Sequence, residues 1–200
     1  LTPIRNKRIS ADPCVHHLYF NDQAYDSHGS LIKWNPAIKS EQDRLGLIQA
    51  LKANKLDIIA TDHAPHTLTE KNQPYLGSLS GGPLVQHALP ALFELYHDGL
   101  LTLEQLVQKT SHNVAELYRM KDRGYLREGY YADLVLVNTN SPWEVSTANI
   151  LSKCGWSPFT GQTFRSSIEK TFVNGNLVYD SGKITHHATG KRLTFEKHRI

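Results

Sequence analysis

A short apolar run at residues 56–61 (LDIIAT) ends abruptly at Asp62, where a polar segment begins. Runs of this kind are typical of strands that are buried on both faces, as strands in parallel sheets are. In a (β/α) barrel, the functional side chains lie at the carboxyl ends of such strands. The run therefore predicts a buried strand that presents Asp62 at a functional edge.

Strands and helices alternate along the first part of the chain. An apolar stretch at residues 9–20, interrupted by Pro13, predicts a short strand with an irregular end, and residues 21–30 are typical of a loop. A first helix is predicted from its cap at Ser40 to about Lys52, and it would bury Leu47, Ile48 and Leu51. A second helix is predicted from Leu84 to a stop at Gly99, and its apolar face would carry Val85, Ala88, Leu89, Leu92, Phe93 and Tyr96. Two shorter helices are predicted at residues 103–109 and 111–120. Residues 66–82 form a polar loop whose length is typical of functional loops.

The pattern changes after Gly124. A strand is predicted at residues 132–137, and residues 170–179 predict a hairpin around the turn Asn174-Gly175. The chain therefore divides into parallel βα units at residues 1–123 and a β-rich module with a tail at residues 124–200.

The polar segment after the apolar run carries the candidate chemistry. The Asp62 carboxylate can bind a metal or move a proton, and Pro65 turns the chain so that His66 can reach the same cleft. A structural alternative is a turn aspartate that caps the next segment, followed by surface histidines. The residues alone leave both interpretations open.

The string ATDHAPH at residues 60–66 resembles the last barrel strand of the dihydroorotases. The resemblance implies an α/β fold, namely the C-terminal part of a TIM-like (β/α)8 barrel with its last two strands and helices, followed by a small β-rich module. It implies that Asp62 binds one zinc of a two-metal site and acts as general base and acid, and that His66 binds the substrate carboxylate. Hydantoinases and allantoinases share the aspartate but generally lack the second histidine, so His66 favours dihydroorotase.

The resemblance extends over nearly the whole chain. Residues 33–44 (KWNPAIKSEQDR) resemble the substrate-contacting loop of the family, which implies a hydrogen bond from Asn35 to the substrate. Residues 80–86 (SGGPLVQ) resemble the loop whose backbone meets the pyrimidine ring, which implies that role for Gly81 and Gly82.

Two further segments are less specific. Residues 9–18 resemble the preceding barrel strand, with Asp12 where relatives usually carry Glu, and residues 129–137 (GYYADLVLV) resemble a general amidohydrolase ending.

His16 and His17 form an adjacent pair within the predicted strand at residues 9–20. Adjacent strand residues point to opposite faces, so the two rings are not expected to chelate one ion. A structural role, or a supporting role behind the metal ligands, is predicted for this pair. The remaining scattered histidines are expected on the surface or on helices: His28, His87, His97, His112, His186, His187 and His198.

Most zinc ligands of the family have no counterpart here. The chain contains no His-x-His, its first residue is Leu1, and its only methionine is Met120. A complete barrel takes about 250 residues. The resemblance therefore implies a fragment, inactive by itself, whose other ligands for two Zn²⁺ ions lie upstream of Leu1.

The composition is that of a globular protein and adds few constraints. The formal net charge of +3 is mild and no apolar stretch is long enough to span a bilayer, so neither a nucleic acid nor a membrane is expected as a partner. Cys14 and Cys154 fit no zinc or redox spacing and are expected to be reduced thiols in a cytoplasmic protein.

The resemblance implies reversible cyclisation of N-carbamoyl-L-aspartate to L-dihydroorotate in pyrimidine synthesis. The expected partners are these small molecules, with a homodimer as an open alternative. Two other functions stay open: a non-catalytic scaffold that kept the fold, and a hydantoinase- or allantoinase-type cyclic amidohydrolase.

Overall fold

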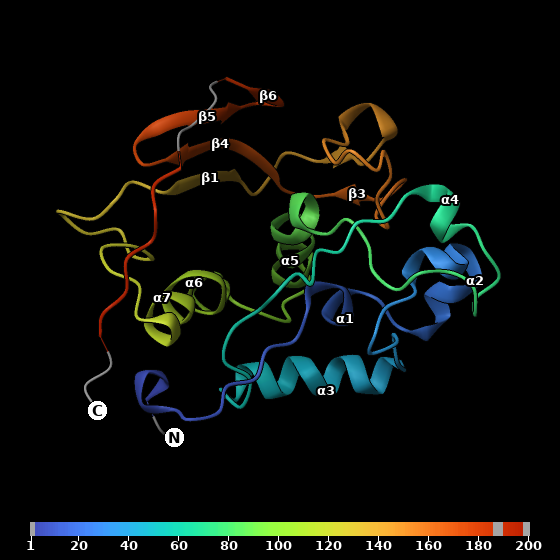
Figure 1. The fold of residues 1–200 in the computed structure, drawn as a ribbon, viewed down its shortest axis with the longest axis horizontal. Helices are drawn as coiled ribbons and strands as arrows, with labels where there is room; N and C mark the ends of the chain where they lie inside the picture. Colours follow the sequence, from blue (N-terminus) through green and yellow to red (C-terminus); the bar gives the residue numbers. More distant parts are fainter. Residues whose placement is uncertain (1–2, 186–189, 198–200) are drawn as a thin grey trace.

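The computed structural model describes residues 3–185 and 190–197 (Figure 1). Its helices are α1 (Val15–Tyr19), α2 (Tyr25–His28), α3 (Glu41–Lys52), α4 (Leu68–Lys71), α5 (Ala88–His97), α6 (Leu103–Val107) and α7 (Asn113–Tyr118). Its strands are β1 (Leu134–Asn138), β2 (Trp143–Glu144), β3 (Thr163–Phe164), β4 (Ser167–Val173), β5 (Asn176–Asp180) and β6 (Lys183–Ile184). Short 3₁₀ turns lie at Ile4–Asn6, Asp22–Ala24, Gly29–Ile32, Val85–His87 and Thr147–Asn149, and a π turn at Gln108–His112.

The two predicted N-terminal strands form a pair of extended segments that run parallel. The amide of Ala60 donates to the carbonyl of Pro13 at 3.0 Å, and the amide of Val15 donates to the carbonyl of Ala60 at 3.0 Å. One parallel bridge, between Cys14 and Ala60, joins them. The prediction of burial on both faces holds for Asp57 and Ile58, whereas the rest of residues 56–61 is half-buried.

The prediction of a strand through Phe20 is wrong, because helix α1 begins at Val15. The backbone of Asp62 enters the left-handed region at a φ of 49°, so the pairing partner turns away just beyond Ala60. Beyond Cys14 the chain closes its own hydrogen bonds as a helix, and this helix buries Val15 and Leu18 on one face.

Helix α3 confirms the prediction from Ser40. The Ser40 hydroxyl accepts from the amide of Asp43 at 3.3 Å, while the Asp43 carboxylate accepts from the amide of Ser40 at 3.2 Å. This reciprocal cap fixes the start of the helix. Ile48 and Leu51 are fully buried and Leu47 packs at the edge of the same core.

Both segments predicted as loops contain helical turns. Residues 21–30 hold a 3₁₀ turn and α2, and the 66–82 loop holds α4. Thr67 and Glu70 form a second reciprocal cap, which stabilises the single turn of α4 inside an otherwise irregular loop.

Helix α5 begins at Ala88 and not at the predicted Leu84, but it ends before Gly99 as predicted, and the φ of 69° at Gly99 suits a residue without a Cβ atom. The prediction that Val85 is buried is wrong: it lies in the 3₁₀ turn before α5 and is 61% exposed. The π turn at Gln108–His112 joins helices α6 and α7 without a break. Where the sequence predicted a gap between two helices, the chain stays helical and only its pitch changes.

The C-terminal part is rich in strands, as predicted. Strands β1, β4, β5 and β6 form an antiparallel sheet in that order, drawn on the opposite side of the molecule from α3 in Figure 1. The hairpin β4–β5 turns at Asn174 and Gly175, both with positive φ, which confirms the Asn-Gly turn. None of the helices among residues 3–185 and 190–197 is long and apolar enough to cross a membrane.

One apolar core joins the two halves of the chain. Buried residues from both sides of Gly124 pack in it, among them Leu18, Ile48, Leu92, Val145, Phe159 and Phe164. The β2–β3 pair therefore packs against the helical part, unlike the outer strands of the larger sheet.

Candidate functional site

Three segments that are distant in sequence meet beyond the end of the extended run 56–61. The amide of Ala64 donates to the carbonyl of Gly82 at 3.2 Å, and His63 and Gly82 form a parallel bridge. The amide of Gly81 donates to the carbonyl of Lys33 at 3.0 Å. The structure thus brings together the segment of Asp62 and His66, the Gly81-Gly82 loop and the residue two positions before Asn35.

Asp62 lies exposed where the extended run ends. It makes no hydrogen bond or ion pair with another residue in the described part of the chain, so its oxygens are available to a ligand. Burial raises the pKa of the neighbouring Cys14 thiol to about 11, and the negative charges of Asp62 and Asp12 add to this effect. An exposed carboxylate beside a neutral thiol can act as a metal ligand or as a proton acceptor.

His63, for which no role was predicted, anchors the same segment. Its Nδ1 accepts hydrogen bonds from the amides of Leu84 at 3.0 Å and Val85 at 3.1 Å. These two bonds fix the segment to the start of the α5 region and require the proton to lie on Nε2 of the neutral ring. The motif D-H-A-P-H contained this residue, but nothing in its spacing distinguished an anchor from a surface histidine.

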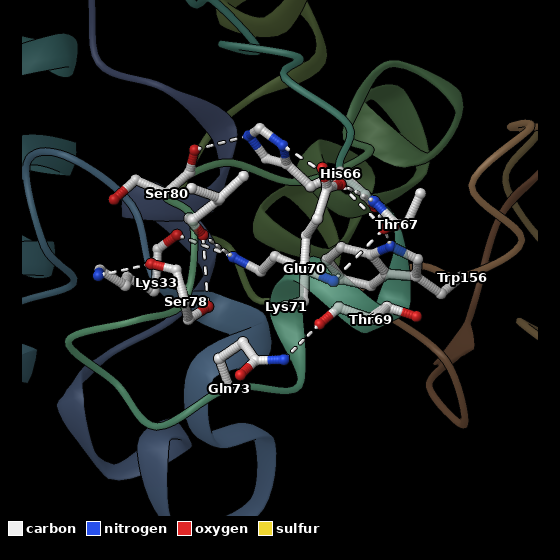
Figure 2. A network of polar contacts seen from close by, with 11 residues as sticks. Lys33, His66, Thr67, Thr69, Glu70, Lys71, Gln73, Ser78, Ser80 and Trp156 are labelled. Carbon is white, nitrogen blue, oxygen red and sulfur yellow. Dashed lines mark hydrogen bonds and ion pairs between the residues drawn. The ribbon is translucent and has the colours of Figure 1, made fainter.

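His66 is half-buried between two loops (Figure 2). Its Nε2 donates to the carbonyl of Ser80 at 3.1 Å, and its Nδ1 lies 3.8 Å from a carboxylate oxygen of Glu70. The indole of Trp156 donates to the His66 carbonyl at 2.7 Å. The ring of His66 is therefore held against the Ser80–Gly82 loop, and Trp156 holds the backbone of the same residue.

Lys71 is a fully buried lysine in the same network (Figure 2). Its Nζ donates to the carbonyls of Lys33 at 3.2 Å and Leu79 at 2.8 Å, and it lies 5.9 Å from the centre of the Trp156 ring. Burial, and secondarily the charge of Lys33, lowers its pKa to about 8. The lysine ties the segment before Asn35 to the segment before Gly81, a role that its place in a polar loop did not reveal.

The stability of the protein should depend on the protonation of Lys71. The folded-state pKa of about 8 lies below the ordinary 10.5, so the unfolded chain binds more protons between these two pH values and stability rises with pH there. Relative to Lys71→Met, the wild-type free energy of unfolding should rise by about 1–2 kcal/mol between pH 8 and pH 10. Urea unfolding at several pH values measures this, with Lys55→Met, at an exposed lysine, as control. A difference that stays flat across this range would contradict the prediction.

Gly81 and Gly82 lie where a side chain does not fit. A Cβ atom on Gly81, whose φ is 128°, would come within 2.6 Å of the Ala64 carbonyl oxygen. One on Gly82 would lie 3.1 Å from the Trp34 ring. The close approach of the Ala64 backbone explains Gly81, and the packing of the Trp34 ring against the chain explains Gly82.

Gly81→Ala should therefore lower the free energy of unfolding by about 1–3 kcal/mol, the cost of forcing a residue into a rare backbone conformation. Gly77→Ala is a matched control in the same loop, because its added Cβ would meet nothing closer than 3.6 Å. Denaturant unfolding of both variants gives the comparison. Equal losses in the two variants would show that the Gly81 contact is relieved at no cost.

Asn35 has an exposed side chain, and its role in substrate binding stays a prediction. The next residue, Pro36, accepts a hydrogen bond through its carbonyl from Nε2 of His17 at 2.8 Å. Through this bond, α1 holds the segment that carries Asn35.

The described residues contain one group of three or more donors close enough to share a metal ion, and it is Cys14, His16 and His17. The prediction that His16 and His17 point to opposite faces of a strand is wrong, because both residues lie on helix α1. Their rings are tilted against each other with centres 4.1 Å apart. Asp62 is not a member of this group.

The predicted position of His87 is also wrong. The residue is 1% exposed, whereas a surface or helix position was predicted, and it lies in the 3₁₀ turn before α5. Its Nδ1 lies 3.0 Å from the hydroxyl of Ser157, and burial lowers its pKa to about 4. The neutral ring thus packs among Trp143, Phe159 and Phe164 as part of the core.

Comparisons with known proteins agree with this architecture. The dihydroorotase of Anaplasma phagocytophilum (strain HZ) is 36% identical over 172 residues, which are 86% of this chain and 38% of that protein. The dihydroorotase of Pyrococcus furiosus is 30% identical over 196 residues, 98% of this chain and 45% of that protein. The chain thus spans less than half the length of these relatives.

Solved structures share the fold. The L-hydantoinase (dihydropyrimidinase) from Arthrobacter aurescens superposes with a TM-score of 0.84 at 22% identity, over 88% of this chain and 40% of that one. The dihydropyrimidinase from Brevibacillus agri NCHU1002 superposes with a TM-score of 0.80 at 22% identity, over 90% of this chain and 41% of that one. A model of the amidohydrolase family matches residues 5–178. Since that match covers most of the sequence, the chain belongs to the amidohydrolase family.

Proposed function

We propose that the protein is a dihydroorotase, which opens and closes the ring amide that relates L-dihydroorotate to N-carbamoyl-L-aspartate, and that this chain supplies part of its active site. One observation carries the proposal. Asp62 is exposed at the end of an extended run paired in parallel with its neighbour, and His66, four residues later, is held against the Ser80–Gly82 loop. Relatives that bear the name dihydroorotase over most of this chain support the choice of substrate.

The finer architecture is part of the same proposal. Residues 1–123 would form the last two strands and helices of a TIM-like (β/α)8 barrel, and residues 124–200 a β-rich module. The parallel pairing of residues 11–15 with residues 57–60 supports the first unit, and the antiparallel sheet of β1, β4, β5 and β6 supports the second. The β2–β3 pair contributes Phe164 to the common core, so the larger sheet would be the more independent part of the module.

Two Zn²⁺ ions are the proposed cofactor, and Asp62 fits one ligand position because its carboxylate is exposed and free of protein partners within the described residues. Among residues 3–185 and 190–197, Asp62 belongs to no group of three or more such donors. When bound, zinc lowers the pKa of a coordinated water and polarises the ring carbonyl.

The residues of this chain would then act on the proton and on the substrate. Asp62 accepts the proton of the attacking water and returns it to the ring nitrogen that leaves. His66 and Asn35 bind the carboxylate and so fix the orientation of the ring. Since the Gly81 amide and the Gly82 carbonyl already bond to Lys33 and Ala64, the two glycines would contribute a fixed backbone surface against the ring.

Assays of the protein at its full natural length, loaded with zinc, test the proposal. Ring opening of dihydroorotate is compared with that of dihydrouracil and of hydantoin. Preference for dihydroorotate is the expected result. Faster turnover of hydantoin would identify a hydantoinase-type enzyme, and a folded protein that opens none of the rings would be a non-catalytic scaffold.

A further inference from the structure

We propose that Cys14, His16 and His17 form a binding site for a thiophilic divalent cation such as Zn²⁺, separate from the metal role proposed for Asp62. One ligand atom from each side chain lies within 4.8 Å of those of the other two. In a tetrahedral zinc site such atoms lie about 3.3–3.6 Å apart, so small side-chain rotations suffice to close the group around an ion.

The backbone explains why three neighbouring residues can converge. Cys14 closes the parallel pairing with Ala60, and the helix starts at the next residue. Along a strand, the side chains of Cys14 and His17 would point to opposite faces. The change to helical backbone instead brings the rings of His16 and His17 to the side of the Cys14 thiol. The transition from extended to helical backbone therefore builds the group.

The state of His16 points to a ligand. The residue is 0% exposed, and neither ring nitrogen has a hydrogen-bond partner within the described part of the chain. The carbonyl of Thr61 lies near the ring but not in hydrogen-bonding geometry. Leaving a buried polar group without a partner is costly, and coordination to a metal would use the ring lone pair.

The hydrogen bond of His17 prepares it for the same task. A carbonyl can only accept, so Nε2 of His17 carries the proton that bonds to Pro36 at 2.8 Å, and the lone pair lies on Nδ1. Metal-binding histidines commonly donate their other ring N–H to a backbone carbonyl in this way. The ring of His16 is in turn fixed by stacking on Trp34, with centres 4.4 Å apart.

The donor set selects the kind of ion. One thiolate and two imidazoles suit Zn²⁺ or Co²⁺ in a tetrahedral site, with water as the fourth ligand, better than Mg²⁺ or Ca²⁺, which take oxygen ligands. Binding breaks the S–H bond of Cys14 and forms a sulfur–metal bond, while the proton passes to solvent. Through His17 and Pro36, a bound ion would also stiffen the segment that carries Asn35.

Titration of the chelator-treated, full-length protein with Co²⁺ alone tests the site, because only a thiolate ligand gives sulfur-to-cobalt charge-transfer absorption. The band should develop in wild type and in Cys154→Ser, and should be absent in Cys14→Ser. Removing a residue that only supports a metal ligand weakens metal binding by roughly 10–100-fold. Because His17 is proposed as a ligand itself, His17→Ala should weaken Co²⁺ binding by at least that factor. A band that persists in Cys14→Ser, or one that never forms in wild type, would overturn the proposal.

A second measurement needs no variant and so does not depend on the folding of one. Zn²⁺ should slow alkylation of Cys14 by at least about tenfold, since the free thiolate is the reactive species, and should leave Cys154 unaffected. Equal rates with and without Zn²⁺ would also overturn the site. Asp62→Asn separates this proposal from the proposed function, because it should abolish ring opening and leave the sulfur–cobalt band intact.

Discussion

Asp62→Ala should lower kcat for ring opening of dihydroorotate by about 10²–10⁴-fold in the full-length protein, the usual cost of losing a positioned acid–base group, with any loss of metal adding to it. The physical reason is the place of the carboxylate. It is exposed at the end of the extended run, has no protein partner in the described part of the chain, and so has no structural bond to lose. Steady-state kinetics and circular dichroism of the variant give activity and fold together.

The unusual backbone of Asp62 requires its own control. Its φ of 49° lies in the left-handed region, which aspartate and asparagine tolerate better than alanine does. Asp62→Asn keeps that tolerance and the shape of the side chain but removes the charge, so it should be as inactive as the alanine variant. Asp122→Ala, at an exposed aspartate with a φ of 57°, should keep wild-type turnover. Activity restored by asparagine would assign Asp62 a backbone role and remove it from the chemistry.

Local signals predicted the parts of the fold whose structure depends on neighbours in sequence. The cap at Ser40 and the turn Asn174-Gly175 fix α3 and the β4–β5 hairpin through bonds within a few residues, and both predictions are confirmed. The segment at residues 9–20 failed for the opposite reason. Its strand ends where its partner turns away at Asp62, which depends on a contact about 45 residues away and not on its own β-prone composition.

In the candidate site, too, the sequence predicted the local motif but not the features that depend on distant contacts. The motif at residues 60–66 located Asp62 and His66, and the structure places that segment beside the Gly81-Gly82 loop. Lys71 could not have been found, since a lysine in a polar loop is expected in solvent, and only the carbonyls that surround it make its burial tolerable. The Cys14 group was missed because the exclusion of a histidine pair rested on the wrong secondary structure.

His66→Ala should lower kcat/KM for dihydroorotate by about 10–150-fold, because a hydrogen bond to a charged group contributes about 1.5–3 kcal/mol. It should spare dihydrouracil, which has no carboxylate to lose. Nε2 of His66 already donates its hydrogen bond to the Ser80 carbonyl, so only Nδ1 is left to bind the substrate carboxylate. Nδ1 would have to carry a proton to do so, and a carboxylate oxygen of Glu70 lies 3.8 Å from it.

The comparison that decides the role of His66 is the ratio of kcat/KM for the two substrates, in wild type and in the variant. His97→Ala is the matched control, since His97 also makes one hydrogen bond through Nε2, to the hydroxyl of Ser166, but lies on α5 away from the Ser80–Gly82 loop. It should leave the ratio unchanged. If His66→Ala lowers both substrates equally, the bond to Ser80 is the important one: His66 would then hold the loop in place, and the preference for dihydroorotate over uncharged rings would have to come from Asn35 or from residues outside this chain.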